Sequence, residues 1–388
     1  MSIGDRGAPA AYAEAAAAAG PEGMALRIRQ AWAQLAGGDP SAAQATLAPL
    51  EPGSDTERTA HLLAQAAAAW FLGDVDEALR AATEAEPISV SAGLAREART
   101  AVQIQAMVAH STGTWPATLQ RGLEMSLSAP DLADTVFDGH LCVAEYVLTS
   151  GVPLERIRTA AEELHAQAVR SGARRARVFS ATVLGEVALI TARTDEADER
   201  LREAVRLSRE ISAVSAEALA SLRLGEAARA RGELKEGDAL LADALVISRW
   251  SPLSGHLQPL AYAALLRASD DPELGRNRLE DAEAQLRGED LPCAFCGMAF
   301  RVAAATAAAR AAQPDRAAAF VSAAEAATAL WRGGPWPAAL DEARGELAWA
   351  KGEEVEARAR LRAASDAFAG LGRQLDANRV ETRLAALV

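Results

Sequence analysis

The sequence predicts an all-α fold: a right-handed superhelical solenoid of about nine helical hairpins and a C-terminal helix. Half of the 388 residues are hydrophobic, but only 4% are aromatic. About a quarter of the residues are alanine, the best helix former, whereas strands favour β-branched and aromatic residues. Turns made of Gly, Asp, Thr or Pro recur along the chain at intervals of about 39 residues, a spacing typical of repeat arrays.

These turns divide the chain into hairpins. The second helices of successive hairpins are expected to open near residues 40, 74, 115, 153, 195, 234, 272, 314 and 353. Glycine suits the left-handed C-cap of the first helix, and Pro, Asp or Glu suits the first turn of the second. One hairpin buries only part of its apolar face, so stacked neighbours complete the core. We therefore expect the first helices to line a concave wall.

The ends and two long links of the chain need separate interpretations. Residues 1–21 begin with Gly, Pro and Asp, which predicts a frayed leader before a solenoid over residues 22–388. Longer links at 87–92 and 251–258 are predicted to kink the stack. The last helix has an apolar end, so a cap or the mate of a homodimer is expected to cover it.

Small residues recur where the two helices of a hairpin must touch. Their spacing is similar to the tetratricopeptide repeat, in which one helix packs directly on the backbone of the other. The resemblance implies a groove that holds a protein or peptide. The period of about 39 residues, against about 34 in the usual repeat, indicates a variant with longer helices. The positions that carry the resemblance include Gly185, Ala197, Gly225, Ala244, Gly345, Ala357 and Ala364.

The last hundred residues carry a second resemblance. The runs at 291–296, 331–336 and 372–377 follow one another as in the C-terminal repeat region of actinobacterial LuxR-type regulators. Those regulators combine an NTPase module, helical repeats and a DNA-binding module, so the resemblance implies signalling or transcriptional regulation. The sequence has no G-x-x-x-x-G-K-[ST] motif to hold phosphates. We expect no enzyme activity and no cofactor.

Composition excludes several classes of partner. A formal net charge of −13 disfavours direct nucleic-acid binding. No apolar run reaches the roughly 18 residues that a membrane span requires. Three cysteines are too few for a disulfide framework. We therefore expect a cytoplasmic protein.

Cys293 and Cys296 form a C-x-x-C motif just before a predicted helix. The helix N-terminus would lower a thiol pKa in a redox pair. A zinc site would need two more ligands, and His256, one repeat earlier, is the nearest candidate. Small thiols packed between hairpins are the interpretation that we favour. No metal or catalytic site is predicted, because the five histidines are scattered.

Two further groups are candidate contacts for a partner or ligand. Arg174, Arg175 and Arg177 open the fifth hairpin, where guanidinium groups would bind carboxylates or phosphates. The alternative interpretation is that these arginines only form a solvated helix end. Trp331 and Trp336 flank a Gly-Gly-Pro link, and tryptophan is a frequent interface anchor. Their alternative is a structural contact that pins adjacent hairpins.

These observations predict a non-enzymatic scaffold or sensor arm of a bacterial regulator, which binds a protein or peptide in its concave groove. The alternative is a repeat domain that binds a small-molecule effector and thereby controls oligomerisation or a docked partner. Peptide binding predicts a polar concave face with regularly spaced Asn, Arg or Lys. Effector binding predicts an enclosed apolar pocket.

Overall fold

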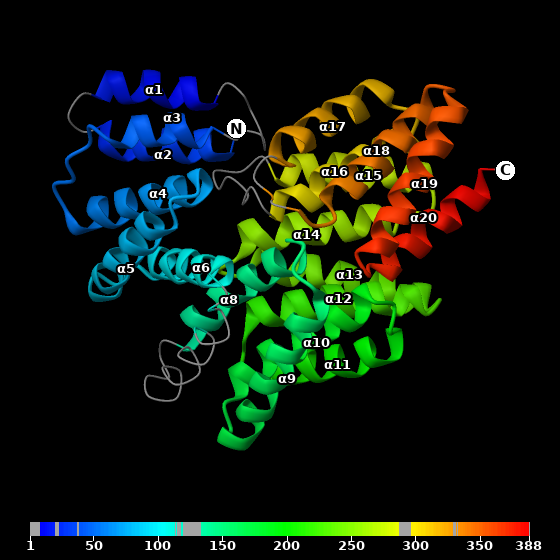
Figure 1. Ribbon diagram of the computed structural model, residues 1–388, viewed down its shortest axis with the longest axis horizontal. Coiled ribbons are helices and arrows are strands. Elements are labelled where there is room, and N and C mark those ends of the chain that lie inside the picture. The colour runs from blue at the N-terminus through cyan, green and yellow to red at the C-terminus, as the bar shows by residue number, and fades with distance from the viewer. Residues whose placement is uncertain are drawn as a thin grey trace. The chain divides into compact units, whose positions relative to one another are not determined.

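The computed structural model describes residues 8–19, 23–36, 39–112, 114, 118, 133–286, 296–328, 331 and 333–387. All nineteen regular elements within these ranges are α-helices (Figure 1). The chain divides into two compact units, Met1–Val143 and Ala144–Val388, here called unit 1 and unit 2. In the described part of the chain, no helix has both the length and the apolarity needed to cross a membrane.

Unit 1 is a short stack of helices with an alanine-rich core. Consecutive helices pack on one another, and α2, α4 and α6 also contact each other across hairpins. Ala64 and Ala66 of α4 and Ala78 and Ala82 of α5 are fully buried between the helices. The helices are α1 (Ala8–Ala19), α2 (Met24–Ala36), α3 (Pro40–Leu47), α4 (Asp55–Leu72), α5 (Val75–Ser91), α6 (Ala95–Ser111) and most of α8 (Ala133–Leu148).

Unit 2 contains the end of α8 and the remaining twelve helices. They form hairpins in which the first helix is buried along most of its length and the second is buried along one stripe. The helices are α9 (Leu154–Ser171), α10 (Arg174–Ile190), α11 (Thr194–Glu210), α12 (Val214–Ala230), α13 (Leu234–Arg249), α14 (Ser254–Arg267), α15 (Pro272–Gln285), α16 (Cys296–Arg310), α17 (Pro314–Thr328), α18 (Trp336–Ala350), α19 (Glu354–Gly370) and α20 (Gln374–Ala386).

The predicted hairpin solenoid is confirmed. The eight second helices in the described residues (α3, α5, α9, α11, α13, α15, α17 and α19) each open within one residue of the predicted position. The predicted opening near residue 115 lies outside the described residues. The fold is therefore an all-α solenoid of hairpins like those of tetratricopeptide repeats.

The same backbone turn ends several first helices, with or without glycine. Gly232 and Gly352 adopt left-handed φ angles of 85° and 81°. Ala192 and Ala312 occupy the equivalent positions with φ of 59° and 55°. In every case, the following N–H donates to a carbonyl five residues earlier, as from Glu233 to Ala228 at 2.9 Å. This closing hydrogen bond keeps the turn geometry where glycine is missing.

Three hairpins of unit 2 close where a leucine of the second helix meets a glycine of the first. A Cβ added to Gly185 would lie 2.5 Å from Leu201 Cγ, and one added to Gly225 would lie 2.9 Å from Leu241 Cγ. Gly345 and Leu361 repeat this contact at 2.9 Å. The neighbouring alanines of the second helices are also buried: Ala197, Ala244, Ala357 and Ala364. These contacts explain why small residues are required at the glycine positions of the first helices and at the alanine positions of the second helices.

The first helices of unit 2 form an inner layer. Contacts join α10 to α12, α12 to α14, α14 to α16, and α16 to α18, and ion pairs join α18 to α20. The last helix, α20, contacts α10, and Leu375 at its start packs against the core cluster that includes Ala181 and Leu189. Within unit 2, the inner helices therefore form a closed ring.

Three expectations about irregular segments need correction. Helix α1 occupies most of the predicted leader (1–21) and packs on α2, because its alanine-rich sequence favours helix. The link expected at 87–92 is shorter, because α5 runs through Pro87 to Ser91. The link expected at 251–258 is also shorter, because α14 begins at Ser254.

Candidate functional site

Charged side chains on the first helices of unit 2 form the candidate site, here called the inner face. Glu186, Glu226 and Glu346 each directly follow a glycine that touches the second helix. One residue along a helix turns the side chain by about 100°, which directs these carboxylates away from the second helix. Their ion pairs reach other first helices, so they lie on the side of the ring that second helices leave uncovered.

Arg223 on α12 is the centre of the first group of charges. Its Nη2 donates to Glu145 Oε2 on α8, its Nε to Glu186 Oε1 on α10, and its Nη1 to Glu226 Oε2 on its own helix. All three distances are 2.7 Å. One guanidinium therefore connects three successive first helices, using the planar array of donors that lysine lacks.

Glu145 and Glu186 both bind Arg223 and shift each other's pKa. The remaining oxygens, Glu145 Oε1 and Glu186 Oε2, are buried and meet no other hydrogen-bond donor in the described structure. Burial and the charge of Glu145 raise the pKa of Glu186 well above its usual value. Burial also opposes ionisation of Glu145, but the charge of Arg223 and the hydrogen bond from Glu186 lower its pKa. Glu186 is therefore the protonated partner and donates to the Glu145 carboxylate.

Glu226 extends this group to the next repeat. Arg267 Nη2 on α14 donates to Glu226 Oε1 at 2.9 Å, while Arg223 holds the other oxygen. Burial would raise the pKa of Glu226, but the charges of these two arginines lower it. The group contains three carboxyl groups and two guanidiniums, so its charges balance when Glu186 is protonated.

A second group of charges joins α16, α18 and α20. Glu346 Oε1 accepts from Arg310 Nε at 2.9 Å and from Arg383 Nε at 2.9 Å, and Glu346 Oε2 accepts from Arg383 Nη2 at 2.9 Å. Burial would raise the pKa of Glu346, but the charge of Arg310 and the hydrogen bonds from both arginines lower it. One buried carboxylate thus holds two guanidiniums.

Helix α20 adds a stripe of charges to the second group. Arg379 pairs with Glu342 on α18 and donates to Asp376 at 3.0 Å. Burial opposes ionisation of Asp376, but the charges of Arg373 and Arg379 lower its pKa. Arg373 Nη1 also donates to the carbonyl of Leu148 at 3.0 Å, which ties the start of α20 to the end of α8.

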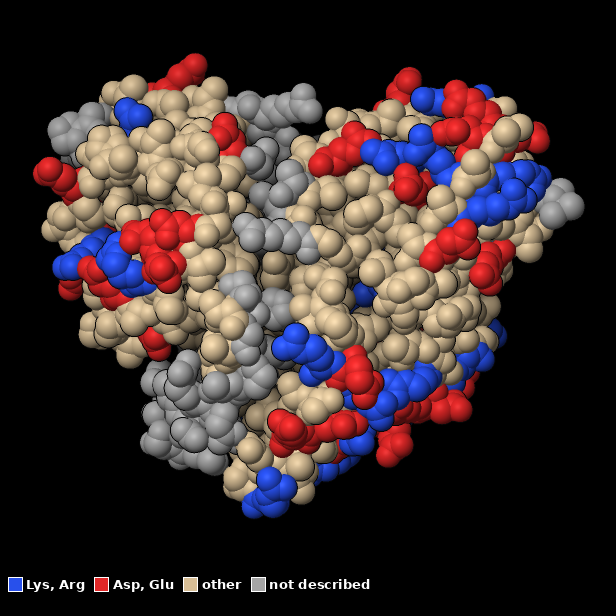
Figure 2. All heavy atoms as spheres, viewed as in Figure 1, with Lys and Arg blue, Asp and Glu red and all other residues tan. Residues whose placement is uncertain are grey.

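The arginines of the second group are more exposed than the carboxylates that hold them. The side chains of Arg310 and Arg383 are 28% and 24% exposed, whereas Glu346 is 1% exposed. Arg379 is 31% exposed, whereas Glu342 is 4% exposed. Figure 2 shows a hollow in unit 2 with a basic side chain at its floor, in the area where Figure 1 labels α12, α13 and α14, and thus near the first group, part of which lies on α12 and α14. Guanidinium groups on buried carboxylates are therefore the chemistry that the second group offers to a ligand.

The three predicted arginines open α10 but belong to different environments. Arg174 is exposed, and Arg175 is half-buried. Arg177 donates to Glu203 on α11, with its Nε at 2.7 Å. Arg177 therefore already binds a carboxylate of its own hairpin.

Trp331 and Trp336 lie together in an aromatic cluster. The Trp331 ring stacks on Tyr146 of α8 with centroids 5.1 Å apart, and its centroid lies 5.3 Å from that of Trp336. A Cβ added to Gly334 in the link between them would lie 2.1 Å from the carbonyl oxygen of Thr149. The two indoles are buried, and the link lies against the end of α8.

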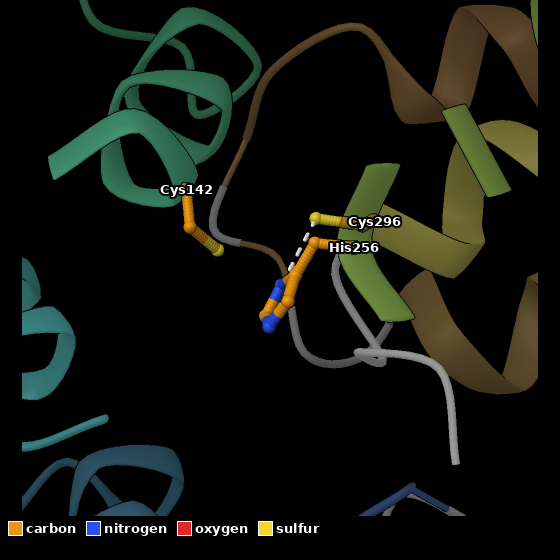
Figure 3. Close-up of side chains that lie close together, drawn as sticks. All are labelled: Cys142, His256 and Cys296. Carbon is orange, nitrogen blue, oxygen red and sulfur yellow. Dashed lines mark hydrogen bonds between the residues drawn. The ribbon is translucent and has the colours of Figure 1, made fainter. Parts of the chain in front are cut away.

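The structure places Cys296 beside His256, the neighbour considered from the sequence. Cys296 is the buried first residue of α16, and its Sγ lies 3.7 Å from His256 Nδ1 on α14 (Figure 3). Cys142, also drawn in Figure 3, belongs to unit 1 and is half-buried on α8. Cys293 lies outside the described residues. The contact between Cys296 and His256 joins two inner helices of unit 2.

Sequence reasoning missed the inner face. The available signal was the pair Gly-Glu, which recurs at 185–186, 225–226 and 345–346 at the same repeat position. Helix packing accounts for the glycines, but the sequence pattern alone does not show that the acidic residue after each glycine pairs with arginines of other first helices. The arginine partners carry no such signal, because they come from different positions on other helices.

Comparisons with known proteins show only distant structural likeness. No family model matches the sequence, and no curated protein matches it. A solved structure of a Rap protein complexed with Competence and Sporulation Factor is 11% identical, with a TM-score of 0.41, covering 94% of this chain and 97% of that chain. A structure of the APC/C hetero-tetramer Cut9–Hcn1 is 12% identical, with a TM-score of 0.43, covering 97% of this chain and 81% of that chain. Likenesses at this level transfer no property of either protein.

Proposed function

We propose that this chain is a non-enzymatic helical-repeat scaffold that binds a protein or peptide on the inner face of unit 2. The observation that carries the proposal is the regular charge on that face, where a glutamate follows the packing glycine in three repeats and arginines from neighbouring first helices bind it. Side chains held rigidly in this way lose little conformational freedom when they bind a partner. A polar face with arginines from successive first helices supports peptide binding over binding in an enclosed apolar pocket.

The same geometry disfavours catalysis by the most perturbed group. Glu186 has a raised pKa, a property also found in catalytic acids. Its side chain is only 2% exposed, and its proton is directed to Glu145. The proton therefore serves to neutralise a buried charge and is not presented to a substrate.

The place of this scaffold in a bacterial signalling or transcriptional regulator is part of the proposal. It is supported by the sequence runs at 291–296, 331–336 and 372–377, which resemble the repeat region of LuxR-type regulators. In such a setting, the inner face would carry the sensing function.

Binding of a compact effector is the second candidate. It is favoured by the contact of α20 with α10, which closes the inner helices into a ring and limits the length of a groove. A ligand inside the ring would stabilise this contact, and a partner that binds the closed ring would respond to it.

A capture experiment tests the proposal with three matched baits. The first is the wild type. The inner-face variant is Arg267→Gln with Arg383→Gln, in which Glu226 and Glu346 each keep another arginine. The control is Arg202→Gln with Arg206→Gln on α11, where both arginines are about half exposed.

Proteins bound from a lysate of the source organism are identified by mass spectrometry, and small molecules by native mass spectrometry. The proposal expects a protein that the wild type and the control recover and the inner-face variant loses. Equal recovery by all three baits would exclude the inner face as the binding site. A co-purifying small molecule that raises the melting temperature, without any captured protein, would favour the effector function.

A further inference from the structure

The second group of charges on the inner face carries more positive than negative charge. Arg310, Arg379 and Arg383 face two carboxylates, Glu342 and Glu346. Adding Asp376 and Arg373 of α20 leaves the same surplus of one positive charge. The first group, around Arg223, has three carboxyl groups against two guanidiniums and therefore no such surplus.

The surplus lies where a ligand can reach it. Glu346 binds Arg310 through Nε and Nη2, and Arg383 also through Nε and Nη2. Each guanidinium has five N–H donors, and among the described residues the Nη1 groups of both arginines have no protein partner, so they can bind a ligand. The buried carboxylate fixes the two guanidiniums, which are 28% and 24% exposed and so can be reached by a ligand.

We propose that Arg310, Arg379 and Arg383 form a subsite for a carboxylate side chain, and that the partner of the inner face is an acidic peptide segment. This inference rests on the proposed function and adds the chemistry of the partner. A carboxylate side chain supplies the negative charge that Arg310, Arg379 and Arg383 lack in Glu342 and Glu346. Guanidinium forks match the geometry of a carboxylate and bind it with strong, charge-assisted hydrogen bonds.

The overall charge of the chain makes this selectivity measurable. With a formal net charge of −13, the protein repels acidic peptides in general. Binding of an acidic probe therefore requires a local site. The attraction should weaken with added salt, since screening acts over roughly 8 Å at physiological ionic strength.

The test measures fluorescence anisotropy of a fluorescein-labelled hexaglutamate with the full chain. A hexalysine with the same label is the probe of opposite charge, and inorganic phosphate is the competitor. The variants are Arg310→Gln and Arg383→Gln, each of which leaves Glu346 one arginine partner. Arg206→Gln on α11, exposed and paired with Glu210, is the matched control.

The expected result is binding of hexaglutamate, weakened about tenfold or more by either inner substitution and unchanged by the control, because each loses one charge-assisted contact. Arg310→Lys and Arg383→Lys keep the positive charge but lose the forked guanidinium. Their affinity for hexaglutamate should lie between that of the wild type and that of the glutamine variants. The lysine variants decide the case if circular dichroism shows a glutamine variant to be unfolded.

Several results would overturn the inference. These are no binding of hexaglutamate, equal binding by all variants, tighter binding of hexalysine, or displacement by phosphate at concentrations where equal acetate has no effect. Capture of a non-acidic protein on the inner face would then leave the proposed function intact. If hexaglutamate binds specifically but no protein is captured, the acidic-peptide subsite is supported and the proposed protein-binding function is contradicted.

Discussion

Arg223 Nε donates to Glu186 Oε1 at 2.7 Å, and this contact joins the first helices of two successive hairpins. The same guanidinium binds Glu145 and Glu226. Stacking of apolar faces explains why repeats adhere to one another. The Arg223 contacts add a directional link, because their donors fit only one arrangement of α8, α10 and α12.

Replacement of Glu186 by glutamine should hardly change stability, whereas the same change at Glu226 should be costly. Glutamine can accept from Arg223 and donate to Glu145 as protonated Glu186 does, so we expect a change below about 0.5 kcal/mol. Glu226→Gln removes an ionised partner of two arginines and should cost about 3 kcal/mol. Urea unfolding monitored by circular dichroism measures both. A costly Glu186→Gln would contradict the protonation of Glu186.

Glu186 and Glu226 should change the stability of the fold with pH in opposite directions. Its folded pKa lies above the ordinary value of 4.5, so its contribution is complete below pH 4.5 and is lost as pH rises through the folded pKa. Glu226 has a lowered pKa, so its contribution is complete above pH 4.5 and is lost as pH falls through the folded pKa.

Urea midpoints of the wild type should therefore contain a decline above pH 4.5 that Glu186→Gln removes. The measurement compares the two proteins from about pH 5 to about pH 9, with Glu210→Gln on the surface of α11 as the control. Parallel curves for the wild type and Glu186→Gln would show that Glu186 does not bind a proton more tightly in the folded chain.

Gly225→Leu should disrupt the packing of its hairpin. Even a Cβ at this position lies 2.9 Å from Leu241 Cγ and 3.0 Å from the Gly237 carbonyl oxygen, so we expect a loss of about 3 kcal/mol or more. Gly255→Ala on α14 meets open space and should stabilise by up to about 1 kcal/mol through helix propensity. Thermal unfolding tests both. Full helicity and an unchanged melting temperature in Gly225→Leu would refute this helix contact.

Trp336→Ala should destabilise unit 2. The indole is buried against Trp331, and truncation of a buried tryptophan typically costs about 3–5 kcal/mol. Trp250 on the outer surface is 81% exposed, so Trp250→Ala should change stability by less than about 0.5 kcal/mol. Chemical unfolding of both variants is the measurement, and equal effects would argue against a structural role of the aromatic cluster.

The double change Cys293→Ser with Cys296→Ser should leave the fold intact. A serine at 296 can keep a hydrogen bond to His256, and the thiol is only one of many buried groups at the start of α16. Circular dichroism and elemental analysis of the purified protein test this expectation. Stoichiometric zinc in the wild type, or a large loss of stability in the variant, would show a metal or redox role.

The hairpin register could be predicted from the sequence because turn residues and small packing residues act locally. Gly232 and Gly352 mark their turns directly. The turns at Ala192 and Ala312 lack glycine, but Asp195 and Pro314, which are typical of the first turn of a helix, follow them. Helix α1 could not be predicted as well, because high alanine content without an apolar stripe gives no sign of burial. The packing of α1 on α2 stabilises α1 as a helix.

The inner face could be predicted only in part, because its contacts join distant residues. The Gly-Glu pairs at 185–186, 225–226 and 345–346 are visible in the sequence. The contact of Arg373 with the Leu148 carbonyl depends on closure of the ring over most of unit 2. Patterns of neighbouring residues in the sequence carry no information on this closure. They also do not show which arginines bind a buried carboxylate.

Hydrogen–deuterium exchange of the captured complex tests the central claim, that the inner face of unit 2 binds the partner, most directly. Exchange rates of the chain alone and with its partner are compared for peptides from inner and outer helices. We predict slower exchange in α20 and in the C-terminal half of α16, with α11 and α13 unchanged. Protection confined to the outer helices, with α16 and α20 unchanged, would contradict the account.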